Sequence, residues 1–318
     1  MTGGELLIAS TLDAICGDPR WLPHPVRVMG WCIAWLDHRV RAICLNSTSL
    51  RFAGICLAGG LPIMTYWIGA LVIEEAERLA GWLGSILSIG LAATTLAARD
   101  LWDHVRAVNG PLNVGDLPAA RRAVSMIVGR DTAQLSESEV ARATVETVAE
   151  SAADGVIAPL FYLAVGGAPL ALAYKAINTL DSMIGHHDKR YADFGWASAR
   201  LDDLTNWIPA RMAAVLLIAG AGLTTGQLEQ VRNGWRVFRR DRSKHPSPNS
   251  GRPEAAMAGI LGVKLGGTNF YDGIAQARPI LGQEGRDAEP NDILSAVKVM
   301  AAASGLGVAI AVGFRCLA

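Results

Sequence analysis

The sequence predicts an all-α protein, a polytopic integral membrane helical bundle with about four to six membrane-embedded helices. Composition supports this fold class, since 51% of the 318 residues are hydrophobic and only 18% are charged. A soluble domain usually has roughly 25% charged residues. Several apolar stretches also approach the roughly 20 residues that a helix needs to cross a bilayer. Long polar segments separate these stretches and hold most of the Lys and Arg residues.

The apolar stretches, taken in chain order, define the expected membrane helices. The segment 1–15 contains Glu5 but no Lys or Arg, so we expect a first helix, embedded or interfacial, and not a secretory signal. Four longer stretches approach the length needed to cross the membrane, at residues 52–73, 79–98, 156–174 and 296–317. A fifth, at residues 212–223, is shorter and follows Pro209 and Arg211.

An acidic turn joins the first two long stretches. It contains Glu74, Glu75, Glu77 and Arg78, whereas the flanking polar segments are rich in Lys and Arg. Loops with an excess of Lys and Arg stay on the cytoplasmic side of a membrane. We therefore expect the turn outside and its flanking loops in the cytoplasm.

The stretch 156–174 raises a problem of topology. If it crosses the membrane fully, the polar segments on its two sides lie on opposite faces. Gly166, Gly167 and Pro169 interrupt it near its middle, and a broken segment is tolerated at membrane depth where protein buries it. We therefore expect the stretch to dip in and return, or the segment 175–206 to line the interior of the bundle.

Four polar segments carry the candidate chemistry of a single expected domain over residues 1–318, at about residues 13–30, 121–155, 175–211 and 241–273. In the first segment, three prolines predict extended or turn geometry in place of a helix: Pro19, Pro23 and Pro25. A stiff loop would then present Asp18, His24 and Arg27. The alternative is a loop that only leads the chain out of the membrane.

The second segment predicts a helix with an acidic stripe. Ser136 followed by Glu139 is a capping-box pattern, so a helix is expected to begin near Ser136. On this helix, Glu146, Glu150 and Asp154 follow one another at four-residue spacing and share a face. Like charges at this spacing destabilise a helix unless Mg²⁺ or arginines offset them, and carboxylate oxygens suit Mg²⁺. These carboxylates are the predicted Mg²⁺ ligands, and the alternative is a solvated acidic face.

The third segment combines a polar helix face with a charged run. Asn178, Asp181 and Ser182 share the face, and Gly185 is expected to end the helix. Residues 186–190 then read His-His-Asp-Lys-Arg. Ionisable groups at a membrane edge are costly and so indicate function. Recognition of phosphate or carboxylate is favoured over a zinc site, and the alternative is an interfacial charge cluster.

The fourth segment predicts a polar loop, because several turn-forming residues follow closely: Pro246, Pro248, Gly251 and Pro253. Such a loop is often a binding loop, and the alternative is a plain linker. Farther on, Gly266, Gly267 and Gly273 predict a glycine-rich turn that could approach a phosphate.

Several common signatures are missing from the sequence. It has no G-x-x-x-x-G-K-[ST] phosphate loop and no G-x-G-x-x-G fingerprint, so ATP binding would need a different cradle. The formal net charge is zero, and no basic stripe predicts a nucleic-acid partner. The five cysteines show no C-x-x-C spacing and are expected to stay reduced.

The polar segments resemble the adenosylcobinamide-phosphate synthase family of cobalamin biosynthesis. The matching motifs stand in the family's order and read GDPRWLPHPVRVMG, VSMIVGRDT, ATVETVAES, DGVIAPLFY, AYKAINTLDSMIGHHDKRYADFGWASARLDD and HPSPNSGRPEAAMAGILGVKLGG. The resemblance extends over about residues 5 to 285. Two positions depart from the expected family pattern: Ser151 in place of Asn, and Arg252 in place of an aromatic residue.

This resemblance implies a multi-pass enzyme of the cell inner membrane. It implies an amide-bond-forming ligase that joins (R)-1-amino-2-propanol, or its O-phosphate, to the propionate carboxylate of adenosylcobyric acid. The product would be adenosylcobinamide or its phosphate, and the reaction would use ATP and Mg²⁺. The expected partners are these substrates and the lipid bilayer, with other corrinoid-pathway enzymes as candidates and no nucleic acid.

Residue chemistry within the matching motifs predicts the site. Activation of a carboxylate as an acyl phosphate needs cations and Mg²⁺, and the attacking amine must lose a proton. The candidate catalytic groups are Asp181, His186 and Asp188. The candidate ATP-binding groups are Arg121, Arg122, Arg130, Lys175 and Asn178. The candidate groups for the other substrates are His24, Lys189, Arg190, Lys244, His245, Asn249 and Glu254.

A membrane transporter or permease with a cavity lined by ionisable residues is the alternative function. A broken helix and ionisable residues near the membrane are also features of transporters. The small number of spans and the lack of a visible inverted repeat favour the enzyme.

Overall fold

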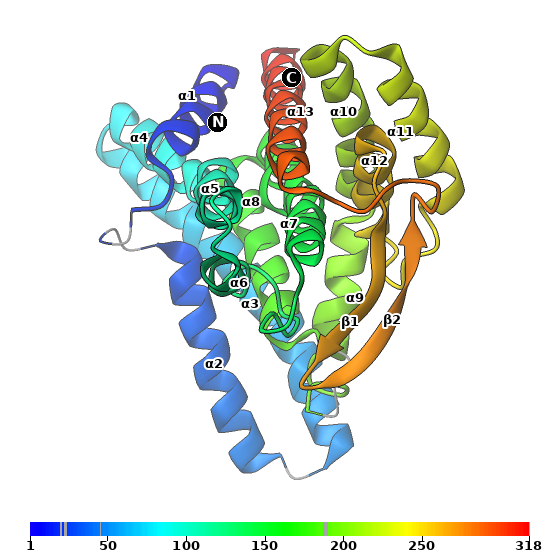
Figure 1. Ribbon diagram of the computed structural model, residues 1–318. Helices are drawn as coiled ribbons and strands as arrows, with labels where there is room; N and C mark the ends of the chain where they lie inside the picture. Colours follow the sequence, from blue (N-terminus) through cyan, green and yellow to red (C-terminus); the bar gives the residue numbers. More distant parts are fainter. Residues whose placement is uncertain (20, 22–23, 45, 187–189, 318) are drawn as a thin grey trace. The chain divides into compact units, whose positions relative to one another are not determined.

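The computed structural model describes residues 1–19, 21, 24–44, 46–186 and 190–317, which form helices and one two-stranded antiparallel sheet (Figure 1). Within these residues, five helical runs are long and apolar enough to cross a membrane: Ser47–Leu79, Gly81–Asn113, Glu137–Ile184, Trp207–Thr225 and Pro290–Leu317. Each run overlaps one of the five apolar stretches of the sequence. The predicted all-α membrane bundle is therefore confirmed, and the chain is a multi-pass membrane protein.

The chain divides into two compact units. Unit 1 consists of Met1–Ala97, Ala158–Asn206 and Val308–Ala318, whereas unit 2 consists of Ala98–Ile157 and Trp207–Gly307. This division does not test the prediction of a single domain over residues 1–318, which stays a prediction.

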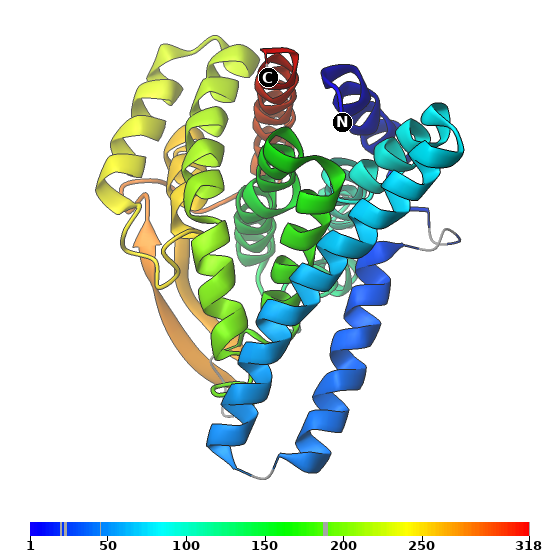
Figure 2. The same ribbon diagram turned by 180° about the vertical axis from the view of Figure 1, so that it is seen from behind.

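Unit 1 is built from helices that pack along the long helix α3. Its elements are α1 (Gly3–Cys16), α2 (Pro25–Ile43), α3 (Ser47–Leu79), α4 (Gly81–Ala93), α8 (Ala158–Ile184), α9 (Trp196–Thr205) and the end of α13 (Pro290–Leu317). Helix α3 packs on both α8 and α9, and α2 packs on α8 (Figure 2). Gly54 allows the close approach to the segment before α9, because a Cβ there would lie 2.0 Å from the Phe194 oxygen.

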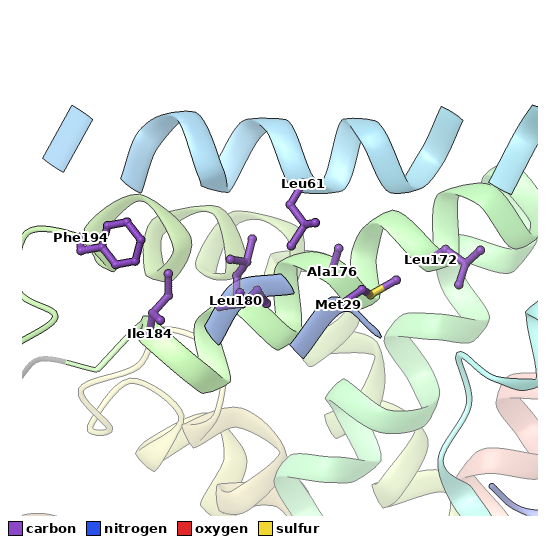
Figure 3. Packing of buried hydrophobic residues seen from close by; sticks show 8 residues of the cluster. Met29, Leu61, Leu172, Ala176, Leu180, Ile184 and Phe194 are labelled. Carbon is purple, nitrogen blue, oxygen red and sulfur yellow. The ribbon is translucent and has the colours of Figure 1, made fainter. Parts of the chain in front are cut away.

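The core of unit 1 follows the helical period of α8. Figure 3 shows four side chains of this helix spaced four residues apart: Leu172, Ala176, Leu180 and Ile184. Leu61 of α3 and Met29 of α2 pack on this stripe. The apolar face of α8 is therefore buried by protein, and its polar residues Asn178 and Asp181 project from other positions of the helix.

The predicted break in the stretch 156–174 is present. Gly167 has φ 69° and ψ −165°, outside the helical region, and Pro169 follows it. In a regular helix the Gly167 N–H would bond to the Leu163 carbonyl. Arg315 of α13 also donates to that carbonyl, from Nε at 3.3 Å and Nη2 at 3.0 Å. The break thus keeps its backbone oxygen satisfied, and the re-entrant path stays a prediction.

Unit 2 joins helices to a β-hairpin. Its elements are α5 (Ala98–Asn113), α6 (Leu117–Val124), α7 (Glu137–Ser151), the π-helical η1 (Ala152–Ile157), α10 (Trp207–Thr225), α11 (Leu228–Asp241), α12 (Gly251–Leu261), β1 (Leu265–Tyr271), β2 (Ile274–Leu281) and most of α13. Helix α12 packs on α10, α11 and α7. The predicted capping box of Ser136 and Glu139 begins α7.

The prediction for the first polar segment is partly wrong. Helix α2 begins at Pro25, with His24 as its N-cap residue, so Arg27 lies in the first helical turn and not in a loop. Proline is tolerated at this position because the first N–H groups of a helix have no partner within it. Pro23, another of the three prolines, lies outside the described residues.

Two loop predictions in the fourth segment are partly wrong: the chain is irregular at residues 242–250 and turns at residues 272–273, but the rest of each predicted loop is helix or strand. Glu254 lies in α12, because the first turn of a helix accepts Pro253 without losing a hydrogen bond. The glycine-rich turn is a hairpin, in which Gly266 and Gly267 lie within β1 at a shift of register. Both glycines have positive φ, at 85° and 88°, a conformation that glycine adopts without the strain of a side chain.

Candidate functional site

Three carboxylates from two helices act on one another in unit 2. Glu146 and Glu150 lie one turn apart on α7, and Glu254 lies in the first turn of α12. The Glu254 side chain is buried, and burial together with the charges of Glu146 and Glu150 raises its pKa well above the usual range. Arg278 and Arg130 act in the opposite direction. These three side chains form an acidic centre, Glu146–Glu150–Glu254, in which the buried Glu254 favours its protonated form.

Glu146 is fully engaged within the protein. It forms an ion pair with Arg130, and both side chains are only 7% exposed. It also accepts a hydrogen bond from the Gly266 N–H at 2.7 Å, which ties the β-hairpin to α7. Arg130 Nη1 donates to Asn269 Oδ1 at 2.9 Å, and Arg142 Nη2 donates to the same oxygen at 3.2 Å. The Arg130–Glu146 pair therefore holds the hairpin in place.

The other two carboxylates have free acceptor capacity. Glu150 is exposed and accepts a hydrogen bond from the Ser250 hydroxyl at 3.0 Å. The buried Glu254 carboxylate accepts no hydrogen bond within the part of the chain that the structure describes. These two groups, and not Glu146, are available to a ligand.

A histidine and an arginine lie beside this acidic centre. His245 Nε2 is 3.5 Å from Arg278 Nη1, and His245 Nδ1 accepts the Ser247 N–H at 3.0 Å. Burial and the Arg278 charge lower the pKa of His245, so the imidazole is neutral near pH 7. Arg278 Nη2 also donates to the Tyr271 hydroxyl at 2.9 Å, which fixes the guanidinium against the hairpin.

A second acidic pair lies in unit 1. Asp181 is on α8 and Asp202 on α9, and burial together with the Asp181 charge raises the pKa of Asp202 to about 7. Asn206 Nδ2 donates to Asp202 Oδ2 at 3.0 Å, and the Tyr174 hydroxyl donates to Asn206 Oδ1 at 2.9 Å. Two close carboxylates do not both ionise easily, so the Asp181–Asp202 pair can hold a proton at neutral pH.

Comparison with known proteins decides the family. Residues 6–300 match the sequence profile of the family described as CobD/Cbib protein. The chain belongs to the CobD/CbiB family. The predicted resemblance is thereby confirmed over nearly the whole sequence.

Curated relatives of this CobD/CbiB chain are similar along their full length. Cobalamin biosynthesis protein CobD of Geobacter metallireducens is 47% identical over 309 residues, covering 97% of this chain and 95% of the relative. CobD of Klebsiella pneumoniae is 43% identical, covering 97% and 96%, and CbiB of Salmonella typhimurium is 43% identical over the same shares. These relatives place the chain in cobalamin biosynthesis. No solved structure matches it.

The predicted Mg²⁺ ligands of this CobD/CbiB chain meet different environments. Glu146 and Glu150 share a face of α7, as predicted, but Asp154 lies in the π-helical turn η1. A π-helix is wound more widely, so four-residue spacing no longer keeps a side chain on the same stripe. Within the described ranges, no three His, Cys, Asp or Glu side chains form a group that could hold a metal.

The residues still fit Mg²⁺ in another way. This ion often uses only one or two carboxylates and completes its coordination with substrate phosphates and water. Glu150 and Glu254 offer such a pair, and a bound cation would offset the charges of Glu146 and Glu150 that oppose ionisation of Glu254. The prediction of Mg²⁺ at Glu146, Glu150 and Asp154 stays a prediction.

The predicted ATP-binding arginines are separately engaged. Arg130 pairs with Glu146, and Arg121 Nε donates to the Leu135 oxygen at 2.7 Å. Arg122 is exposed on α6. Lys175 and Asn178, the other two predicted groups, are half-buried on α8 in unit 1.

The predicted substrate-binding groups are dispersed. His24 Nε2 lies 3.0 Å from Asp18, and Arg190 Nη2 lies 3.1 Å from Asp37. In unit 2, Lys244 Nζ lies 2.7 Å from Asp241. The structure brings three of the predicted residues of the fourth segment near the start of α12: His245, Asn249 and Glu254.

The predicted catalytic groups lie around the end of α8. Asp181 lies in its last turn, next to Asp202, and His186 is exposed just after the helix ends at Ile184. Asp188, like Lys189 among the substrate-binding groups, lies outside the described residues.

Sequence reasoning did not assign two groups of the site. Asp202 lies four residues before Asn206, the spacing of a helical pair, and that spacing was the available signal. Arg278 belongs to β2, and no local pattern pointed to it because the hairpin itself was not expected.

Proposed function

We propose that the chain is an ATP-dependent amide ligase of cobalamin biosynthesis. It joins (R)-1-amino-2-propanol or its O-phosphate to the propionate carboxylate of adenosylcobyric acid, giving adenosylcobinamide or its phosphate. Membership of the CobD/CbiB family supports the pathway. The observation that best supports the proposed ligation is the acidic centre with Arg278 and His245 beside it.

The first step activates the carboxylate. An oxygen of the propionate attacks the terminal phosphorus of ATP, the bond to the bridging oxygen breaks, and ADP leaves. Glu150 and Glu254 would hold Mg²⁺, which neutralises phosphate charge when it is bound. Arg278 would offset the charge that develops on the transferring group.

The second step forms the amide. The amine attacks the carbonyl carbon of the acyl phosphate, a proton leaves the nitrogen, and inorganic phosphate departs. Asp181 is proposed to accept that proton and share it with Asp202, whose pKa lies near neutrality. His245, as a neutral imidazole, is the other base that the residues offer.

The proposed location is the cell inner membrane. ATP is available on its cytoplasmic side, and loops rich in Lys and Arg remain on that side. Other corrinoid-pathway enzymes are proposed as neighbours, because the substrate and the product are both corrinoids.

The test uses purified full-length protein in detergent with adenosylcobyric acid, aminopropanol phosphate and Mg-ATP. We expect a corrinoid amide and an equal amount of ADP. Absence of both products from the folded wild-type protein would refute the ligase, and it is the result that a transporter would give.

Variants separate the two steps. Glu150→Gln and Glu254→Gln should lower ADP release about 100-fold, because both remove a proposed Mg²⁺ ligand. The matched control is Glu137→Gln, an exposed carboxylate in the first turn of α7. Asp181→Asn should lower amide formation while hydroxylamine still traps the acyl phosphate. Unchanged turnover in Glu150→Gln would contradict its role.

A further inference from the structure

Three arginines gather in unit 2 at the ends of three packed helices. Arg211 lies near the start of α10, Arg242 is the C-cap residue of α11, and Arg252 is in the first turn of α12. These helices pack on one another. The guanidinium groups lie close enough for mutual repulsion, since Arg252 and Arg242 both act on Arg211, and Arg242 acts on Arg252.

None of the three arginines has a carboxylate partner among the residues that the structure describes. Other arginines of unit 2 do: Arg240 contacts Glu284 at 2.8 Å, and Arg286 contacts Asp292 at 2.6 Å. Within the described residues, the three positive charges of this cluster are therefore not offset by ion pairs as those of Arg240 and Arg286 are.

Neutral groups hold these guanidinium groups in place. Arg211 lies 3.8 Å from the centre of the Trp207 ring and donates to the Trp207 oxygen. Arg242 lies 5.5 Å from the centre of the Phe238 ring. Aromatic rings and carbonyls orient a cation without cancelling its charge.

Arg252 is anchored in the same manner. Its Nε donates to the Pro248 oxygen at 2.9 Å, which leaves its other N–H groups free to bind a ligand. Burial and the neighbouring Arg242 lower the pKa of Arg252, as expected where positive charge lacks compensation. Arg211 and Arg252 are half-buried and Arg242 is exposed, so the cluster is reachable from solvent.

We propose that Arg211, Arg242 and Arg252 bind the phosphate group of a phosphorylated substrate. A guanidinium matches two phosphate oxygens with two parallel N–H donors, and an anion among the three cations removes their repulsion. The identity of the substrate rests on the proposed function, in which the phosphate belongs to ATP or to aminopropanol phosphate. Arg252 departs from the expected family pattern, so its contribution would be particular to this chain.

The first experiment measures phosphate binding without turnover. Inorganic phosphate and pyrophosphate are titrated calorimetrically into purified full-length protein in an uncharged detergent. Arg242→Gln should raise the dissociation constant about tenfold, the usual scale for losing one charged hydrogen bond. The matched control is Arg232→Gln, which removes the same charge from an exposed position on the same helix. Equal affinity of Arg242→Gln and wild type would overturn the site.

The second experiment identifies the source of the phosphate. If Arg242→Gln raises KM for aminopropanol phosphate but not for free aminopropanol, the site holds the amine substrate. If it raises KM for ATP, the site holds the nucleotide. Wild-type KM values for all three substrates in Arg242→Gln, from a protein that makes the amide, would overturn the site and leave the ligase standing.

The binding experiment also tests the phosphate site if the ligase hypothesis fails. A wild-type protein that makes no amide but loses phosphate affinity in Arg242→Gln would refute the ligase and support the site. Arg211→Gln should weaken phosphate binding as well, and thermal unfolding of each variant checks that the fold is retained.

Discussion

The two units each bring carboxylates together, but they balance the charge differently. In unit 2, the charges of Glu146 and Glu150 act on the buried Glu254, and Arg278 and Arg130 partly offset them. In unit 1, the strongest influences on Asp202 after burial are the Asp181 charge and the neutral amides of Asn206 and Asn178. In both units burial and a neighbouring like charge raise the pKa of one carboxyl and favour its protonated form, but only the unit 2 centre also has arginines acting on it.

This difference suggests a division of labour between the two centres. An acidic centre with nearby arginines is suited to a metal ion and a transferring phosphate. A carboxylate pair surrounded by amides is suited to accepting and releasing a proton near neutral pH. Each centre should then depend on the groups that act on its carboxylates, which are arginines in unit 2 and amides in unit 1.

Arg130→Ala should have the largest effect on stability. It leaves Glu146 buried without its ion-pair partner, and breaking a buried pair costs about 3–5 kcal/mol. Thermal unfolding in detergent and protease cleavage of the hairpin would both report the loss. The control is Arg78→Ala in the acidic turn, where the pair is exposed and worth about 1 kcal/mol or less.

A paired replacement sharpens this prediction. Arg130→Met combined with Glu146→Leu removes both charges and should recover part of the lost stability. If the double variant is no more stable than Arg130→Ala, the damage comes from lost contacts to Asn269 and Gly266 and not from an unpaired charge.

Asp202→Asn should change the pH dependence of stability. Because the pKa of Asp202 is raised from 3.8 to about 7, the folded protein binds this proton more tightly than the unfolded chain does. Wild-type stability therefore falls as pH rises from about 4 to about 7, and ionised Asp202 is destabilising above that range. The variant lacks this cost, so its melting temperature should exceed that of wild type by more at pH 8 than at pH 5.

The control for this experiment is Glu75→Gln, which removes an exposed carboxylate near the end of α3. Its effect should be small and nearly equal at the two pH values. An equal shift of Asp202→Asn at pH 5 and pH 8 would show that this carboxyl does not titrate in the range.

Ser250→Ala should have the smallest effect. It removes the hydroxyl that donates to the exposed Glu150 at 3.0 Å, and such a hydrogen bond contributes about 0.5–1.5 kcal/mol. We expect turnover to fall by less than about tenfold. The defect should be seen as a higher Mg²⁺ concentration needed for half-maximal rate. A loss as large as that of Glu150→Gln would mean that Ser250 itself contacts the substrate.

The membrane helices could be predicted because the length of an apolar stretch is a local property of the sequence. The start of α7 could be predicted because the capping box at Ser136 is also local. The break at Gly167 was predictable for the same reason. The hairpin was not, since glycines at positive φ within β1 look like a turn until the strand pairs with β2.

The composition of the centres depended on contacts between distant segments. Glu254 joins Glu146 across the packing of α12 on α7, and Asp181 meets Asp202 across the packing of α8 on α9. The spacing rule that placed Asp154 with the glutamates assumed one regular helix, and the π-helical turn changes that phase. Local patterns therefore found most of the members but not the groups that they form.

The contact between Arg315 and the Leu163 carbonyl also has a consequence for biogenesis. The two residues are separated by 152 positions in the chain. During synthesis the broken segment emerges from the ribosome long before Arg315 does, so the hydrogen bonds from this side chain form only after α13 has been made. Completion of unit 1 is therefore a late event of membrane insertion, and release of the polypeptide before Arg315 would leave that segment without its final hydrogen bond.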